Sequence, residues 1–162
     1  MLVPPPVVAL GATVAQRALA RHPDRPGALR ATAAATMAVG SVALAVTAAR
    51  SFRRAGTTLA PEDPGQASVL VTTGPHAVSR NPMYLGLTGV LVANAIRLRS
   101  WTAWVPVAAF VAFIDRIQIR AEEAALLGRF GADYETYRTR VPRWLDRRSL
   151  ARATPGAGSG GR

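Results

Sequence analysis

The chain contains no cysteine, no lysine and few aromatic residues, which make up 6% of its composition. The absence of cysteine excludes disulfide bonds, thiolate metal sites and cysteine nucleophiles. The absence of lysine excludes Schiff-base chemistry on that residue and a phosphate-binding loop that depends on it. The chemistry of this protein therefore falls to other side chains.

Acidic residues are also scarce, with 9 against 20 basic residues and a net charge of +11 in 162 residues. Such a charge suggests nucleic-acid binding, but the arginines are confined to particular stretches. Ten of them lie from residue 116 onward. Four apolar blocks contain no charged residue, namely 2–15, 31–49, 81–96 and 101–114. Charge packed between apolar blocks is typical of a polytopic membrane protein, so no nucleic-acid partner is expected.

The first two apolar blocks predict membrane helices. Ala31–Ala49 comprises 19 uncharged residues and would extend about 28 Å as a helix, close to the thickness of a bilayer core. Leu2–Ala15 is shorter and opens with three prolines in succession, which suit the start of a helix better than its middle. We expect both to cross the membrane.

The next two blocks predict an antiparallel helical hairpin. Asn81–Ile96 and Trp101–Ile114 are separated only by residues 97–100, which leaves room for a very tight turn. Gly89 and Ala93 lie four residues apart, a spacing of small residues that permits close helix packing. Elsewhere in this hairpin, Pro106 is expected either to kink the second helix or to lie in its first turn.

Beyond Ile114 the pattern becomes charged and amphipathic, which predicts a helix that leaves the bilayer and ends near Gly128–Gly131. A second short helix is expected over Asp133–Arg140, because Val141-Pro142 follows it. Together these helices would form a C-terminal cap. Residues 149–162, with four glycines and a proline, are expected to be a disordered tail.

The predicted fold class is an all-α integral membrane helical bundle of about four transmembrane helices, formed by one domain over residues 1–148. Arginine counts set its orientation. The loop 50–80 holds four arginines and the C-terminal segment ten, whereas the opposite side holds four in the first loop and two in the turn 97–100. Positively charged segments stay in the cytoplasm, so we expect the C-terminus there.

No metal site is expected, because His22 and His76 are the only histidines and neither has a partner at a ligand spacing. The chain instead offers two polar segments next to the hairpin. In the first, Asn81 is predicted to cap a helix whose first residue is Pro82, with Arg80 at the lipid headgroups. The same helix N-terminus could also bind an anion.

The second polar segment contains adjacent acids. Glu123 has Arg116 and Arg120 on its side of the helix, which predicts ion pairs within the helix. Glu122 has only uncharged helical neighbours, so its carboxylate must find solvent, another helix or a ligand. Tyr134 and Tyr137 lie three residues apart, a spacing typical of one packed helix face.

Several motifs follow one another in a fixed order: Arg80-Asn81-Pro82-Met83-Tyr84-Leu85-Gly86, the hairpin, Glu122-Glu123, Phe130-Gly131, Tyr134, Tyr137 and Val141-Pro142-Arg143. In order and spacing they resemble the isoprenylcysteine carboxyl methyltransferase family and its bacterial, phospholipid-methyltransferase-like relatives. The resemblance extends over Val69–Trp144. Eukaryotic members have histidine at the position of Asn81, whereas the bacterial branch has asparagine there and varied substrates, so the resemblance does not assign prenylated protein as the substrate.

The resemblance implies an enzyme of the bacterial inner or plasma membrane that transfers a methyl group from S-adenosylmethionine to a lipophilic or membrane-embedded small acceptor. It implies catalytic roles for Arg80, Tyr84 and Glu122. His76 is the one side chain with an ordinary pKa suited to a general base. With the family resemblance, the residues predicted to bind the cofactor are His76, Asn81, Pro82, Met83, Tyr84, Glu122, Glu123, Tyr134, Tyr137 and Arg143. The alternative is a non-enzymatic basic membrane protein whose C-terminal arginines bind anionic lipid or nucleic acid.

Overall fold

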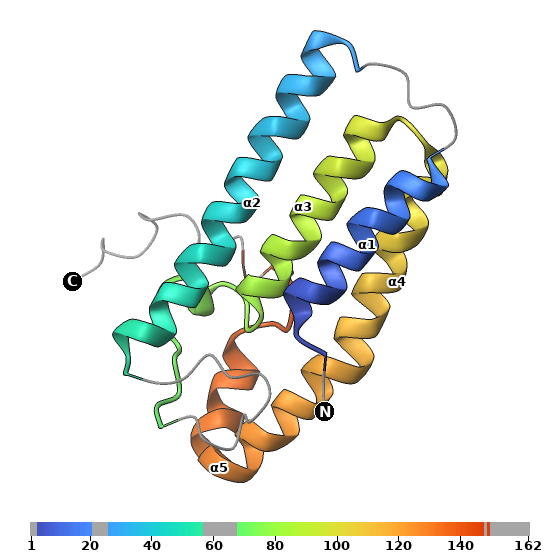
Figure 1. Ribbon diagram of the computed structural model, residues 1–162. Helices are drawn as coiled ribbons and strands as arrows, with labels where there is room; N and C mark the ends of the chain where they lie inside the picture. Colours follow the sequence, from blue (N-terminus) through green and yellow to red (C-terminus); the bar gives the residue numbers. More distant parts are fainter. Residues whose placement is uncertain (1–2, 21–25, 57–67, 148, 150–162) are drawn as a thin grey trace, which may run out of the picture.

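The computed structural model describes residues 3–20, 26–56, 68–147 and 149, and all regular structure in these ranges is helical. Four helices run side by side as an elongated bundle, and a fifth lies at one end of it (Figure 1). The helices are α1 (Pro5–Leu19), α2 (Ala28–Arg54), α3 (Pro82–Leu98), α4 (Trp104–Phe113) and α5 (Ile119–Arg140). The expected all-α fold is confirmed.

Prolines and glycines set the helix boundaries. α1 begins at Pro5, inside the proline run, and α3 begins at Pro82, because proline lacks the N–H that the first turn of a helix leaves unused. The hairpin turn is closed by Arg99 in a left-handed conformation, with φ of 53°. Pro106 lies in the first turn of α4, one of the two positions expected for it.

The helix after the hairpin departs from regular α geometry twice. A π-helix over Ile114–Gln118 joins α4 to α5. Gly131 then adopts a positive φ of 49° and divides α5 into two helical segments. This break confirms the expected helix end near Gly128–Gly131 and the short helix that follows it.

The predicted disordered tail lies outside the described residues, except for its first residue. Ser149 is buried, and its hydroxyl donates a hydrogen bond to the carbonyl oxygen of Val78 at 2.8 Å.

Glycines bring α2 and α3 into close contact. A Cβ atom at Gly86 would lie 2.6 Å from the backbone oxygen of Ser41, and one at Gly89 would lie 2.2 Å from the Ser41 hydroxyl oxygen. Both distances are shorter than any normal contact. At Gly86 the atom in the way belongs to the backbone, so only glycine fits, whereas at Gly89 it is a side-chain hydroxyl that can rotate. Gly89 thus lies in a close helix contact as expected, and Gly86 shares it.

Near the hairpin turn, a buried side-chain amide holds the bundle together. Gln16 of α1 is fully buried, and its Nε2 donates hydrogen bonds to the carbonyl oxygens of Leu91 at 2.9 Å and Ala103 at 3.0 Å. Its Oε1 accepts a hydrogen bond from Asn94 Nδ2 at 2.8 Å. One side chain thereby joins α1 to both arms of the hairpin.

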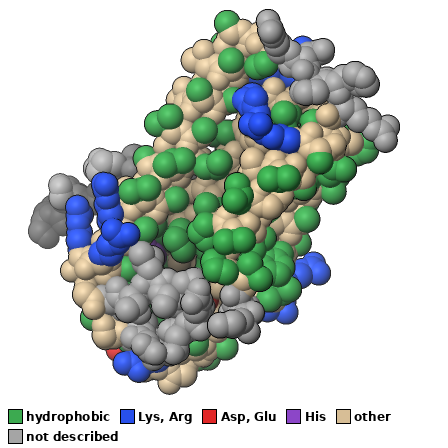
Figure 2. Space-filling model, in the orientation of Figure 1, with side chains coloured by type: hydrophobic (Ala, Val, Ile, Leu, Met, Phe, Trp, Pro, Cys, Tyr) green, Lys and Arg blue, Asp and Glu red, His purple; other side chains and the backbone are tan. Residues whose placement is uncertain are grey.

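The periphery of the bundle is apolar. Apolar side chains extend along the visible face, and arginines gather mainly toward its ends (Figure 2). Among the most exposed are Leu10, Leu29, Val39 and Trp101. Two helical stretches are long and apolar enough to cross a membrane, Ala28–Arg54 and Trp101–Arg140, and α3 is apolar but shorter. These features indicate membrane association, while four full spans remain a prediction.

Candidate functional site

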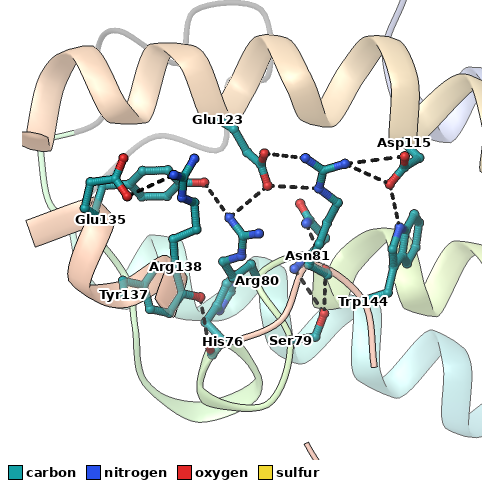
Figure 3. A network of polar contacts seen from close by, with 12 residues as sticks. His76, Ser79, Arg80, Asn81, Asp115, Glu123, Glu135, Tyr137, Arg138 and Trp144 are labelled. Atoms are coloured by element: carbon teal, nitrogen blue, oxygen red, sulfur yellow. Dashed lines mark hydrogen bonds and ion pairs between the residues drawn. The ribbon is translucent and has the colours of Figure 1, made fainter. Parts of the chain in front are cut away.

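The two polar segments singled out in the sequence meet at the α5 end of the bundle. The backbone N–H of Arg80 donates a hydrogen bond to the carbonyl oxygen of Pro142 at 2.9 Å. The Ser79 hydroxyl and the Asn81 Nδ2 both donate to the carbonyl oxygen of Arg143, at 3.1 and 3.0 Å. Residues far apart in the chain are therefore fixed side by side (Figure 3).

The amide of Asn81 does not do what the sequence predicts. Asn81 directly precedes α3, but its side chain makes no capping hydrogen bond to the helix. Its amide is used for the carbonyl of Arg143, and its own backbone N–H donates to the hydroxyl of Ser79 at 3.2 Å. Asn81 therefore has the predicted N-cap position, but its side chain contacts the C-terminal segment and does not cap the helix.

Glu123 lies between two arginines from different parts of the chain. Its Oε1 is 2.8 Å from Arg80 Nη1, and its Oε2 is 2.6 Å from Arg143 Nη2. The Glu123 side chain is only 15% exposed. The ion pairs expected with Arg116 and Arg120 are not formed among the described residues, because these tertiary partners replace the helical ones.

Arg143 is the centre of this charged cluster. Its Nε donates to Glu123 Oε1 at 3.1 Å, so the guanidinium grips that carboxylate with two nitrogens, and its Nη1 donates to Asp115 at 3.2 Å. Trp144 Nε1 donates to the same Asp115 oxygen at 2.8 Å. Hydrogen bonds to Glu123 raise the pKa of Arg143 above its ordinary value, so it stays charged. All three of its side-chain nitrogens are engaged.

Glu122 has different surroundings. Its Oε1 accepts hydrogen bonds from the Tyr84 hydroxyl of α3 and from Gln118 Nε2, the latter at 2.7 Å. Its Oε2 accepts none from any residue that the structure describes. The carboxylate has no cationic partner in this part of the chain, as the sequence predicts, and it finds another helix.

Gln118 is a site residue to which the sequence analysis assigned no role. It is fully buried at the end of the π-helix, and its Oε1 has no hydrogen-bond partner among the described residues. The available signal was its position four residues before Glu122, which places both on one helix face. Asp115 and its hydrogen bond with Trp144 were not predicted either, because this contact joins distant parts of the chain.

Tyr134 and Tyr137 pack in a second apolar cluster together with Val141, as their spacing predicts. The hydroxyl of each tyrosine also forms a hydrogen bond to a residue outside this cluster. Arg80 Nη1 donates to the Tyr134 hydroxyl oxygen at 3.0 Å, and the Tyr137 hydroxyl donates to the carbonyl oxygen of His76 at 2.7 Å. These tyrosines anchor the segment before α3 to α5.

The His76 imidazole is buried against α2. Its ring meets that of Phe52 edge to face, with 4.8 Å between the centroids. Burial lowers the pKa of His76 to about 4, so the imidazole is neutral at neutral pH. No hydrogen bond among the described residues joins it to the acidic pair.

The remaining predicted residues take structural positions. Pro82 is the buried first residue of α3, and Met83 packs partly buried against the core of the bundle. No group of three or more metal-ligating side chains forms in the described ranges.

An apolar helical bundle with a polar, partly buried site at one end defines a membrane-associated protein. The chain belongs to the phospholipid methyltransferase family, whose model matches residues 29–133. This family is one of methyltransferases, which supports an enzyme. The matched region includes the site residues from His76 to Glu123 and ends before Tyr134 and Arg143.

A second comparison gives a shorter relative. An uncharacterized protein of Haemophilus influenzae is 40% identical over 63 residues, which cover 39% of this chain and all of that protein. No solved structure matches the chain.

Proposed function

We propose that this protein is an integral membrane methyltransferase that uses S-adenosylmethionine and methylates a lipophilic or membrane-embedded small molecule. The family supports the reaction class. When bound, the cofactor supplies a methyl group on a sulfonium, which is reactive in itself, so the protein needs to supply alignment and a site that excludes water. A chain without cysteine or lysine can provide both.

The observation that carries this proposal is the state of the Glu122 carboxylate. One of its oxygens is held by Tyr84 and Gln118, and the other accepts no hydrogen bond from the described residues. Near it, the buried Oε1 of Gln118 has no partner in the described chain. Unused acceptors suit a ligand rich in hydrogen-bond donors, such as the ribose hydroxyls and amino group of the cofactor.

The cluster of Arg80, Glu123, Arg143 and Asp115 supports this site as a scaffold. It ties the segments around residues 80 and 143 to α5 and thereby sets Tyr84 of α3 opposite Glu122. Arg80 keeps a buried Nε that has no partner among the described residues, so it is better placed than Arg143 to meet the cofactor carboxylate. Asn81, Pro82, Met83, Tyr134, Tyr137 and His76 would frame the pocket.

Cofactor binding to the detergent-solubilised protein tests the proposal. We expect saturable binding of labelled S-adenosylmethionine in the micromolar range that survives ~0.5 M salt, because the Glu122 site is partly buried. A basic protein that only contacts phosphates would bind anionic lipid or nucleic acid instead, with affinity that falls steeply as salt rises. Absence of cofactor binding would overturn the proposal.

The acceptor is found by a second experiment. The purified protein is incubated with labelled cofactor and a lipid extract of a bacterial membrane, and the products are separated. Label in an organic-soluble product supports a lipophilic acceptor. Binding without any transfer would point to a member of the family that has lost its activity.

A further inference from the structure

Two glutamines of this protein are fully buried, and their environments differ. Gln16 uses every part of its amide, with two hydrogen bonds from Nε2 and one to Oε1. Gln118 uses only its Nε2, which donates to Glu122. Its Oε1 is buried without a partner in the described part of the chain.

A buried acceptor without a partner lowers the stability of a fold, because it loses its hydrogen bonds to water and gains none. A methionine has a similar volume and would remove this cost, but it would also remove the hydrogen bond from Nε2 to Glu122. Stability therefore accounts for the amide at residue 118 less fully than for the one at residue 16, where every polar atom has a partner.

The backbone at Gln118 is unusual as well. It ends the π-helix between α4 and α5, and such single π turns occur frequently at functional sites. From this turn its Nε2 reaches the same Glu122 oxygen that accepts the Tyr84 hydroxyl. Two donors on one oxygen fix the rotation of the carboxylate and leave Oε2 without a donor among the described residues.

We propose that Gln118 is a positioning residue of the methyltransferase site, which holds the Glu122 carboxylate so that Oε2 is available to a donor group of the cofactor. This inference rests on the proposed function. Gln118 acts through Glu122, and the unused Oε1 is the cost of placing an amide donor there.

The test compares Gln118→Met with Gln16→Met as a matched control, because both replace a fully buried glutamine with an apolar residue of similar size. Binding of labelled S-adenosylmethionine and thermal unfolding are measured on the same detergent-solubilised samples. We expect Gln118→Met to weaken binding about tenfold, while its Tm falls much less than that of Gln16→Met, because the lost hydrogen bond to Glu122 is offset by removal of the unpartnered Oε1. Gln16→Met should lower the Tm and leave binding within about twofold.

The outcomes separate the two levels of the argument. Equal cofactor affinity in Gln118→Met and the unmodified protein would overturn the positioning role alone. A fall in Tm or a loss of folding in Gln118→Met, as large as in Gln16→Met, would show a structural role and also overturn it. If the unmodified protein binds no S-adenosylmethionine, the proposed function fails and this inference fails with it.

Discussion

At the scale of single residues, two adjacent carboxylates have opposite tasks. Neighbouring positions on a helix point about 100° apart, so Glu122 and Glu123 face different surroundings. Glu123 lies between Arg80 and Arg143, whereas Glu122 lies beside Tyr84 and Gln118 without a cation among the described residues. Glu123 therefore links separate parts of the fold, and Glu122 is the acid to which the proposed function assigns the cofactor.

Glu122→Gln is expected to weaken S-adenosylmethionine binding about 10- to 100-fold and to change the Tm little, because it removes a charged acceptor that makes no ion pair. Titration of labelled cofactor into the solubilised variant measures this. Glu135→Gln is the matched control, since Glu135 forms an exposed pair with Arg138 away from the site. Unchanged affinity in Glu122→Gln would refute the assignment.

Glu123→Gln should instead destabilise the protein by about 2 kcal/mol, because it leaves two partly buried arginines without their shared carboxylate. Thermal unfolding in detergent measures the loss. The sequence alone suggests a smaller effect, since it pairs Glu123 with exposed arginines of its own helix. A Tm close to that of the unmodified protein would restore that simpler interpretation.

His76 makes stability depend on pH. Burial lowers the pKa of His76 to about 4 from an unfolded value near 6.5, so between these values the unfolded chain binds more protons. The contribution of His76 to the free energy of unfolding is therefore complete above pH ~6.5 and is lost as the pH falls toward ~4. The loss amounts to at most about 3 kcal/mol.

Unfolding temperatures across this pH window test the effect. His76→Phe keeps an aromatic ring against Phe52 and removes the titrating group, so its Tm should fall less on acidification than that of the unmodified protein. Parallel curves for the two proteins would assign the acid sensitivity to other groups.

At the scale of helices, the sequence predicts most boundaries, because prolines, glycines and the edges of charge-free blocks act locally. Pro82 starts α3, and Gly131 divides α5 where the pattern indicates. The π-helix could not be predicted, since nothing in the composition of Ile114–Gln118 differs from an ordinary helix. The partners of Asn81 and Glu123 could not be predicted either, because they come from the segment around Arg143.

The contact between α2 and α3 depends on two glycines. Gly86→Ala should destabilise the protein by about 2 kcal/mol, because the added methyl group would press on the backbone of Ser41 and separate the helices. Gly40→Ala is the matched control, since a Cβ atom there meets nothing within 4 Å and alanine favours the helix. In chemical or thermal unfolding, Gly86→Ala should be less stable than the unmodified protein, and Gly40→Ala should be equally stable or more stable.

At the scale of the whole molecule, the two ends of the bundle differ. The turn between α3 and α4 lies at the end where α1 stops and α2 begins, and the charged site lies at the other (Figure 1). Since S-adenosylmethionine is made in the cytoplasm, the proposed function requires the site end to face that compartment. The arginine distribution supports the same orientation.

The lack of cysteine makes this orientation directly measurable, because any introduced thiol is the single one in the chain. Ser100→Cys places it in the hairpin turn, and Ala124→Cys places it on an exposed position of α5. Both are small substitutions at opposite ends of the bundle, so each serves as the control for the other. A membrane-impermeant maleimide is added to spheroplasts, which have lost their outer membrane but keep a closed inner membrane. It should label Ser100→Cys at once and Ala124→Cys only after the inner membrane is permeabilised. Labelling of Ala124→Cys in closed spheroplasts would place the site outside, where no cofactor is supplied, and would contradict the proposed enzyme together with its topology.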